Sequence, residues 1–377
     1  MDDERYMGEA LKLAQRALGR TSPNPMVGAV IVKNGQIVGR GWHHKAGTAH
    51  AEIHALNEAG ASAAGATIYV TLEPCSHTGR TGPCTEALIY AGIKKVVVAM
   101  TDPNPLVAGR GLDSLRRAGI EVVEGVLAAQ AAQLNEIFIK WITTGMPFIA
   151  LKTAMTLDGK IATYTGHSRW ITSSDARLYV HALRNQYDAI LVGIGTVLAD
   201  NPELTTRLPQ GGKNPIRIIL DSEARTPLTA KVVVDGQAPT IIAVTARAPT
   251  DRTEALRQAG VEVLVLSECS NEVSLRSLFK LLGSRMITSI LVEGGSTVNG
   301  AIIDANLADK LYWFIAPKLI GGTSAPNPIG GPGVATMDEA VQLEDLFLEQ
   351  VGPDILITAN FLSREGRHVY RTCGRIR

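Results

Sequence analysis

Residues 67–84, TIYVTLEPCSHTGRTGPC, join a strand signal to the start of a helix. The first six residues are β-branched, aromatic or apolar, which is typical of a buried strand. Pro83-Cys84 then begins a helix that Gly92 ends. Strand and helix signals alternate in this way through the first half of the chain, which predicts an α/β domain with mostly parallel strands. Asn34-Gly35 adds a hairpin turn between two further strand signals.

Two domains are expected in this chain of 377 residues. A helix over Ala128–Ile142 ends shortly before Gly145, and a new strand, Phe148–Thr153, follows. Beyond that strand the α/β alternation begins again, and the tail becomes rich in Gly and Pro from Ile320 to Gly333, which indicates a long loop. We therefore place one domain at residues 1–145 and a second at residues 146–377.

Composition and charge argue against several classes of protein. Hydrophobic residues make up 45% of the chain and charged residues 19%, as in ordinary globular domains. The formal net charge is +1 and no run of Lys or Arg occurs, so a nucleic-acid partner is not expected. No apolar run is long enough to cross a bilayer, and the acidic start does not resemble a signal peptide. A cytoplasmic protein without a membrane partner is the expectation.

Four residues form the pattern of a catalytic zinc site: His50, Glu52, Cys75 and Cys84. Imidazole nitrogen and thiolate sulfur are ligands that zinc prefers, and a catalytic site uses three protein ligands and leaves one position for water. Zinc makes that water a stronger acid, and Glu52 can move its proton to a ring nitrogen and to departing ammonia. The order His-x-Glu, Pro-Cys and a second Cys is that of zinc deaminases. The sequence therefore predicts one Zn²⁺ per chain, with Glu52 as general acid and base.

The spacing of the two cysteines leaves alternatives open. Eight residues, SHTGRTGP, separate Cys75 from Cys84, which is longer than the usual spacer of zinc deaminases. His77 in this segment could compete as a ligand. A structural zinc site would normally have a fourth protein ligand and would not need Glu52. Two unrelated buried cysteines are the remaining alternative.

Motifs along the whole chain carry a resemblance to a known family. The stretches TSPNPMVGAVIV, HAEIHAL, YVTLEPCSHTGRTGPC and DPNPLVAGRG resemble the deaminase half of the bifunctional riboflavin-biosynthesis deaminase/reductases. The stretches LKTAMTLDGKIAT, SRWITSSDAR, DAILVGIGTVLADNPELTTR, LDSEARTP, LVEGGSTVNG and APKLIGG resemble the reductase half. That family carries the long loop between its zinc cysteines, and Gly82 stands where a proline is expected before Pro83.

The resemblance implies two folds and two successive reactions. The first domain would have a cytidine-deaminase-like α/β/α fold and the second a dihydrofolate-reductase-like α/β fold. The first would hydrolyse the 2-amino group of 2,5-diamino-6-(5-phosphoribosylamino)pyrimidin-4(3H)-one. The second would reduce the ribosyl group of 5-amino-6-(5-phosphoribosylamino)uracil to ribityl with NADPH. Families of this kind are often dimers or tetramers, so a homo-oligomer is expected.

The second domain contains one good candidate for phosphate binding, LVEGGSTVNG at residues 291–300. A strand ends at Val292, Gly294-Gly295 free the backbone, and a helix start at Ser296 would present amides to a pyrophosphate. An ordinary strand–turn–helix is the alternative. LVGIGT lacks the third glycine of the usual dinucleotide motif. By resemblance, NADPH would be held by Ala154, Trp170, Thr196, Asp200, Ser222, Gly295, Ser296, Thr297, Val298, Asn299, Gly300 and Ala301.

The substrate of the second domain would, by resemblance, be held by Ser168, Arg184, Leu204, Arg207 and Glu293. The two arginines offer bidentate forks to its phosphate, and Glu293 could meet ring or ribose hydroxyl groups. Lys152 and Asp200 are candidates to help open or polarise the ribose. Ion pairs at the arginines, a core position for Trp170 and a turn cap at Asp200 are the alternatives.

Five residues of the first domain are candidates for lining the pyrimidine pocket: Asn24, His43, His44, Asp102 and Asn104. Both asparagines lie in Pro-Asn-Pro frames that stiffen the backbone around an amide able to read a ring edge, although turn formation explains them equally well.

Two other functions compete with this interpretation. One is a zinc deaminase of a nucleic-acid base with an appended nucleotide-binding domain, which would need a basic groove and stacking aromatics. The other is a structural zinc module joined to a nucleotide-binding regulator.

Overall fold

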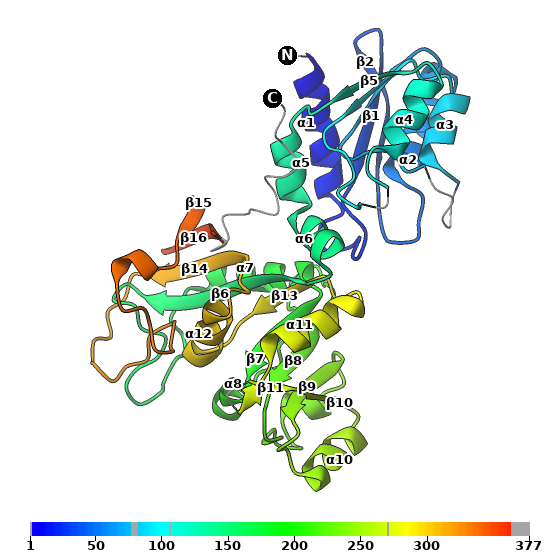
Figure 1. The fold of residues 1–377 in the computed structure, drawn as a ribbon. Helices are drawn as coiled ribbons and strands as arrows, with labels where there is room; N and C mark the ends of the chain where they lie inside the picture. Colours follow the sequence, from blue (N-terminus) through cyan, green and yellow to red (C-terminus); the bar gives the residue numbers. More distant parts are fainter. Residues whose placement is uncertain (1, 77–81, 106, 270, 363–377) are drawn as a thin grey trace. The chain divides into compact units, whose positions relative to one another are not determined.

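The computed structural model describes residues 2–76, 82–105, 107–269 and 271–362 (Figure 1). These residues divide into two compact units: the first ends at Gly145 and the second begins at Met146. His77, the possible competing ligand, lies outside the described residues. None of the described helices is both long enough and apolar enough to span a membrane.

The N-terminal unit is built on a five-stranded sheet with the order β2-β1-β3-β4-β5. β1 pairs antiparallel with both β2 and β3, and the other two pairs are parallel. The expectation of mostly parallel strands is therefore wrong for this unit, because β1 joins the sheet through a hairpin. Asn34 and Gly35 form its turn with positive φ. The strands are β1 Gly28–Lys33, β2 Gln36–Trp42, β3 Thr67–Val70, β4 Lys95–Val98 and β5 Glu121–Glu124.

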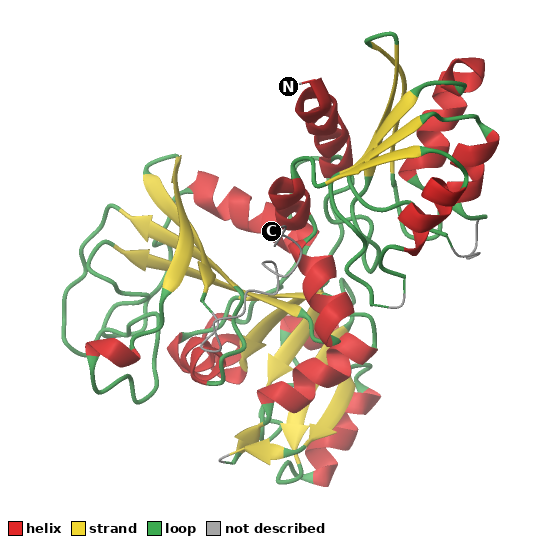
Figure 2. Ribbon diagram, turned by 45° about the horizontal axis from the view of Figure 1, so that its top comes forward, coloured by secondary structure: helices red, strands yellow, loops and turns green. Residues whose placement is uncertain are grey.

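Helices cover both faces of this sheet (Figures 1 and 2). Successive strand residues point to opposite faces, so Ile31 packs toward α2, α3 and α4, whereas Val30 packs toward α1, α5 and α6. The unit is thus a three-layer α/β/α sandwich. Its helices are α1 Asp2–Gln15, α2 Ala51–Ala59, α3 Cys84–Tyr90, α4 Arg110–Arg117, α5 Ala128–Leu134 and α6 Glu136–Thr144, and a 3-10 turn, Gly60–Ala63, follows α2.

The second unit is built on a nine-stranded sheet with the order β10-β9-β8-β7-β13-β6-β14-β16-β15. Neighbours from β10 to β14 are parallel, and β14, β16 and β15 are antiparallel. The strands are β6 Phe148–Thr156, β7 Ala189–Gly193, β8 Ile216–Leu220, β9 Thr240–Thr245, β10 Glu262–Leu266, β13 Ser289–Val292, β14 Lys310–Ala316, β15 Leu343–Val351 and β16 Asp354–Phe361. A separate small hairpin joins β11 Glu268–Cys269 to β12 Glu272–Val273.

Two hydrophobic cores flank this larger sheet. Leu191 belongs to the core that packs against α11 and α12, and Val192 belongs to the core on the opposite face with α8, α9 and α10. Residues 317–336, between β14 and the 3-10 turn Met337–Glu339, contain no helix or strand, in agreement with the predicted long loop. The helices are α7 Ser174–Gln186, α8 Ile194–Asp200, α9 Lys231–Val234, α10 Thr250–Gln258, α11 Leu275–Ser284 and α12 Ser296–Asp304.

Candidate active sites

Three side chains that could hold zinc meet in the N-terminal unit. His50 immediately precedes α2, Cys75 follows β3, and Cys84 is the first residue of α3. His50 Nδ1 lies 3.2 Å from Cys84 Sγ and 3.5 Å from Cys75 Sγ. The ligand atoms of all three residues lie within 4.8 Å of one another. One imidazole nitrogen and two sulfurs at this spacing form a donor set that fits zinc.

Hydrogen bonds within this cluster favour a thiolate at Cys75. Contacts with Cys84 and His50 lower the pKa of Cys75 to about 4, and the backbone amide of Cys84 donates to Cys75 Sγ at 3.4 Å. The same contact, together with burial, raises the pKa of Cys84. Zinc binding requires both thiols to be deprotonated.

Glu52 lies in the first turn of α2 beside this cluster. Its side chain is buried, and burial raises its pKa to about 7. A carboxyl group that titrates near neutrality can both accept and return a proton, as a general acid and base must. The side chain also hydrogen-bonds with Cys84, which places it next to the zinc ligands.

Two of the predicted pocket residues connect to His50, His43 directly and Asn24 through His43. The ring of His43 packs edge-on against His50 with centroids 5.4 Å apart, and Asn24 Nδ2 lies 3.4 Å from His43 Nε2. His44 instead stacks on His54, with ring centroids 4.4 Å apart. The structure therefore associates Asn24 and His43 with the zinc cluster, whereas His44 belongs to a neighbouring aromatic stack.

Asp102 and Asn104 lie on a segment that a buried glutamate holds. Asn104 N donates to Asp102 Oδ1 at 2.9 Å, and Asp102 N donates to Glu73 Oε2 at 3.0 Å. Glu73 belongs to no motif that predicts a role for it. Its only signal in the sequence is an acidic residue placed between an apolar strand and the Pro74-Cys75 pair.

The second unit contains a cavity of about 1710 Å³. It lies where β7, β8 and β13 end, since Gly193, Ser222 and Glu293 are among its lining residues. Ligands of α/β sheets commonly bind at the carboxyl ends of strands. Nine of the twelve residues predicted to hold NADPH line this cavity: Ala154, Thr196, Asp200, Ser222, Gly295, Ser296, Thr297, Val298 and Ala301.

The other three predicted NADPH residues have distinct surroundings. Trp170 is 63% exposed, which excludes the alternative of a core position, and the Arg177 guanidinium lies 4.6 Å from its ring centroid. Asn299 is buried and donates to Pro328 O at 2.9 Å. A Cβ at Gly300 would lie 2.2 Å from Gly330 O, so the long loop packs closely on α12.

The start of α12 suits a pyrophosphate. Helix α12 begins at Ser296 beside the cavity, and its first amides have no intrahelical acceptor. A Cβ at Gly193 would lie 2.9 Å from Val298 Cγ2, and a Cβ at Gly294 would lie 2.7 Å from Val298 Cβ. Glycines at the ends of β7 and β13 therefore let both strands approach this helix. The cavity and the helix end together fit a dinucleotide.

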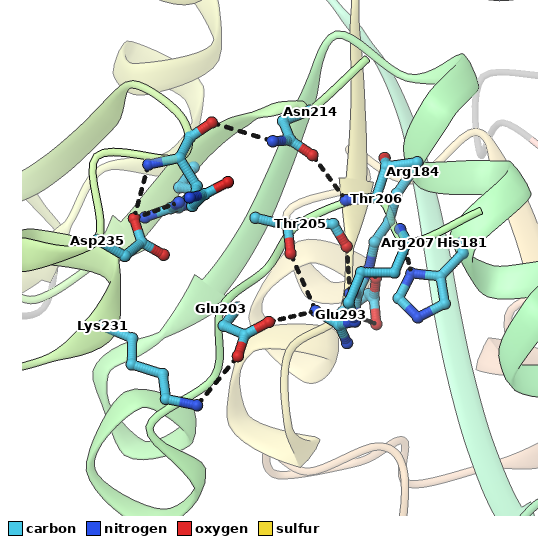
Figure 3. Close-up of polar contacts among 12 residues, drawn as sticks. His181, Arg184, Glu203, Thr205, Thr206, Arg207, Asn214, Lys231, Asp235 and Glu293 are labelled. Carbon is cyan, nitrogen blue, oxygen red and sulfur yellow. Dashed lines mark hydrogen bonds and ion pairs between the residues drawn. The ribbon is translucent and has the colours of Figure 1, made fainter. Parts of the chain in front are cut away.

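Glu293 forms the centre of a buried cluster of charges, and Figure 3 shows it next to Arg184. Arg184 contacts it through Nε at 2.6 Å and Nη2 at 3.0 Å, and Lys152 Nζ lies 3.6 Å from its Oε2. Although burial opposes ionisation, Arg184 and Lys152 lower the pKa of Glu293 to about 2. Burial lowers the pKa of Lys152. The fork of Arg184, which the sequence assigns to a phosphate, is occupied by Glu293 in the structure.

Arg207 is the more accessible of the two arginines (Figure 3). Its side chain is 52% exposed, and its Nη1 lies 2.9 Å from both Glu203 Oε2 and Thr205 Oγ1. The backbone amide of Arg207 donates to His181 Nδ1 at 3.3 Å. Burial and two neighbouring arginines lower the pKa of His181 to about 4, so the ring is a neutral acceptor. The sequence gives no signal for this role of His181.

The remaining substrate candidates are divided between the cavity and its surroundings. Ser168 lines the cavity, as do Glu293 and Lys152. Leu204 is buried with a positive φ, in the same segment as Arg207. Asp200 forms an ion pair with Arg169 at 3.4 Å.

Comparisons with known proteins match both units. Residues 1–100 match the family described as the cytidine and deoxycytidylate deaminase zinc-binding region, and residues 147–357 match the RibD C-terminal domain. The riboflavin biosynthesis protein RibD of Bacillus amyloliquefaciens is 47% identical, covering 98% of this chain and 99% of its own length. The protein of the same name from Escherichia coli K12 is 46% identical, covering 95% and 99%.

Solved structures give the same result. Form 1 of Acinetobacter baumannii RibD is 40% identical with a TM-score of 0.86, covering 96% of this chain and 99% of its own. A diaminohydroxyphosphoribosylaminopyrimidine deaminase/5-amino-6-(5-phosphoribosylamino)uracil reductase from Thermotoga maritima is 39% identical with a TM-score of 0.83 and the same coverage.

These matches confirm the predicted fold class, the zinc-binding deaminase domain and the NADPH-dependent reductase domain. They also confirm that the substrate is a small molecule. The match of the second unit to a reductase domain argues against the alternative of a nucleotide-binding regulator. By identity over nearly its full length, the chain belongs to the RibD family of bifunctional deaminase/reductases of riboflavin biosynthesis.

Proposed function

We propose that residues 1–145 hydrolyse the 2-amino group of 2,5-diamino-6-(5-phosphoribosylamino)pyrimidin-4(3H)-one and that residues 146–377 reduce the deaminated product. The second step would convert the ribosyl group of 5-amino-6-(5-phosphoribosylamino)uracil to ribityl at the expense of NADPH. The name of the Thermotoga maritima relative, which states both activities, supports this pair of substrates. The observation that carries the proposal is the His50, Cys75 and Cys84 cluster beside the buried Glu52.

In the deaminase, Glu52 moves the protons. Zinc held by His50, Cys75 and Cys84 supplies a Lewis acid that makes water a better nucleophile at neutral pH. Glu52 accepts one proton from the attacking water and passes it to the ring nitrogen as the C–O bond forms. It then accepts the second proton, from the added hydroxyl group, and passes it to the amino group, which leaves as ammonia as the C–N bond breaks and the carbonyl forms. Its raised pKa, about 7, suits both transfers. Asn24, Asp102 and Asn104 are proposed to bind the pyrimidine ring.

In the reductase, NADPH supplies the hydride. It is proposed to be held by Trp170 and by nine residues that line the cavity: Ala154, Thr196, Asp200, Ser222, Gly295, Ser296, Thr297, Val298 and Ala301. Lys152 lines the cavity with its Nζ 3.6 Å from Glu293 Oε2, and it is proposed to polarise the ribose oxygen. Arg184 and Lys152 keep Glu293 ionised, so Glu293 can accept hydrogen bonds from substrate hydroxyl groups. With Ser168, these residues would orient the ribose. Arg207, whose side chain is half exposed, is proposed to meet the phosphate.

Glu52→Gln tests the first step directly. The amide keeps the size of the side chain but cannot accept a proton, so ammonia release should fall by at least about a hundredfold while zinc stays bound. Glu58→Gln makes the same exchange on an exposed side chain of the same helix and should release ammonia normally. Normal ammonia release by a zinc-loaded Glu52→Gln enzyme would contradict the proposed mechanism.

We also propose that the protein acts in the cytoplasm on a free small molecule and self-associates as a dimer or tetramer. Its dependence on NADPH supports the location, and its near-neutral charge supports a partner other than nucleic acid. Strand β15 lies at the edge of the larger sheet, and Leu346, Phe347 and Leu348 on it are about 60% exposed, which supports self-association. Sedimentation at several concentrations should show a species heavier than one 40.1 kDa chain.

A further inference from the structure

Glu73 is a buried carboxylate that the chemistry above does not use. Its side chain is 6% exposed, and it lies two residues before the zinc ligand Cys75. Glutamate is almost never buried to this degree unless hydrogen bonds or charges compensate for the loss of water. The contacts of Glu73 therefore indicate what it does.

The carboxylate of Glu73 accepts hydrogen bonds from four backbone amides of one later segment. Its Oε2 accepts from Asp102 N at 3.0 Å and from Gly109 N at 2.9 Å. Its Oε1 accepts from Gly111 N at 2.7 Å and from Leu112 N at 3.4 Å. The N-terminal end of α4 also favours a negative charge. Since the N-cap residue of α4 is a glycine without a side chain, Glu73 takes the role of its cap.

The two segments are in close contact at this point. A Cβ at Gly111 would lie 2.1 Å from Pro74 O and 3.0 Å from Glu73 Oε1, so only glycine permits the approach. The backbone contributes as well, because Glu73 N donates to Met100 O at 3.0 Å. The start of α4 is thus held directly against the residue that precedes Cys75.

We propose that Glu73 is a positioning residue of the deaminase, which sets the place of Asp102 and Asn104 relative to the zinc ligand Cys75. The inference rests on the proposed role of Asp102 and Asn104 in binding the pyrimidine. Asn104 N donates to Asp102 Oδ1, so a displacement of Asp102 moves both side chains. Replacing one carboxylate oxygen by a donor leaves two of the four amides without their acceptor and lets this segment shift, while the zinc ligands and Glu52 remain. The ring is then bound less tightly.

The test compares Glu73→Gln with the wild-type chain, full length and loaded with zinc. The amide keeps the size of the side chain but places an N–H₂ donor against backbone donors. We expect the KM for the diaminopyrimidine to rise by about tenfold, with kcat changed by less than about threefold. Zinc content and the reductase activity of the same chain should not change. Glu121→Gln, the same exchange at a 60% exposed side chain of β5, should leave both constants at wild-type values.

A second variant keeps the test decisive if Glu73→Gln loses zinc. Glu73→Asp retains the charge but shortens the side chain by one methylene group, so zinc should stay bound. The KM for the diaminopyrimidine should still rise by about threefold, which on a logarithmic scale is half of the rise expected for Glu73→Gln. Wild-type constants in a zinc-loaded variant, or loss of zinc from both variants, would overturn the proposal. A wild-type chain that releases no ammonia would instead contradict the proposed function, so the two failures are distinguishable.

Discussion

Replacing Glu293 by glutamine should destabilise the second unit by an amount that depends on pH. The surroundings of Glu293 lower its pKa from 4.5 to about 2, which corresponds to about 3 kcal/mol of stabilisation at neutral pH. Independently, removing one partner of a buried ion pair costs about 3–5 kcal/mol, because the other charges stay buried. Here Arg184 and Lys152 would be left without their carboxylate.

The sign of the pH dependence follows from the lowered pKa. The stabilisation is fully present above pH 4.5, the ordinary value, and is lost as the pH falls toward about 2. The free-energy difference between wild type and Glu293→Gln should therefore be largest at neutral pH and shrink below about pH 4.5.

Differential scanning calorimetry can measure this difference. The transition that NADPH shifts to higher temperature belongs to the second unit, and Glu293→Gln should lower its midpoint by about 6–12 °C at pH 7. Glu262→Gln breaks an exposed pair with Arg285 in the same unit and should change stability by less than about 1 kcal/mol. A midpoint of the Glu293→Gln variant equal to that of the control, or a difference that does not change with pH, would refute the reasoning.

Two further experiments test the reductase. Gly193→Ala places a Cβ against Val298 Cγ2 and should raise the KM for NADPH by about fivefold. In a Val298→Ala background that atom is gone, so adding Gly193→Ala should change the KM for NADPH little; a further fivefold rise there would count against the steric argument. Arg207→Gln should raise the KM for the phosphorylated substrate by about tenfold and leave the KM for NADPH unchanged, and steady-state kinetics showing equal changes in both would exclude a phosphate role for Arg207.

Local patterns were sufficient for the elements around the zinc site. The strand expected over Thr67–Leu72 is β3, Thr67–Val70, and the helix expected to begin at Pro83-Cys84 begins at Cys84. The hairpin turn at Asn34-Gly35 has the positive φ values that these residues favour. Each of these features depends on residues close together in the sequence.

Features that depend on distant contacts could not be predicted in this way. The antiparallel pairing of β1 with β3 joins residues almost forty positions apart, such as Val30 and Tyr69. The hairpin of β15 and β16 gives no clear signal, because β15 mixes apolar and acidic residues that are mostly exposed.

The same distinction holds for the active sites. His50, Glu52 and the two cysteines are recognisable because few other residue types can perform zinc chemistry. Glu73 is not, because its partners are backbone amides 29 to 39 positions later, which carry no sequence signature. The sequence assigns the guanidinium of Arg184 to a phosphate, but in the structure it binds Glu293. That contact joins residues 109 positions apart, so local patterns do not reveal it.

Each half of the chain buries its own set of apolar side chains, and this separation has a genetic consequence. A substitution that disrupts the hydrophobic core of one unit should leave the other unit able to fold. One class of allele would then retain a reductase deprived of its substrate, and the other would retain a deaminase whose product accumulates. Mixing two such defective proteins should restore the complete conversion, which is complementation between alleles of a single gene.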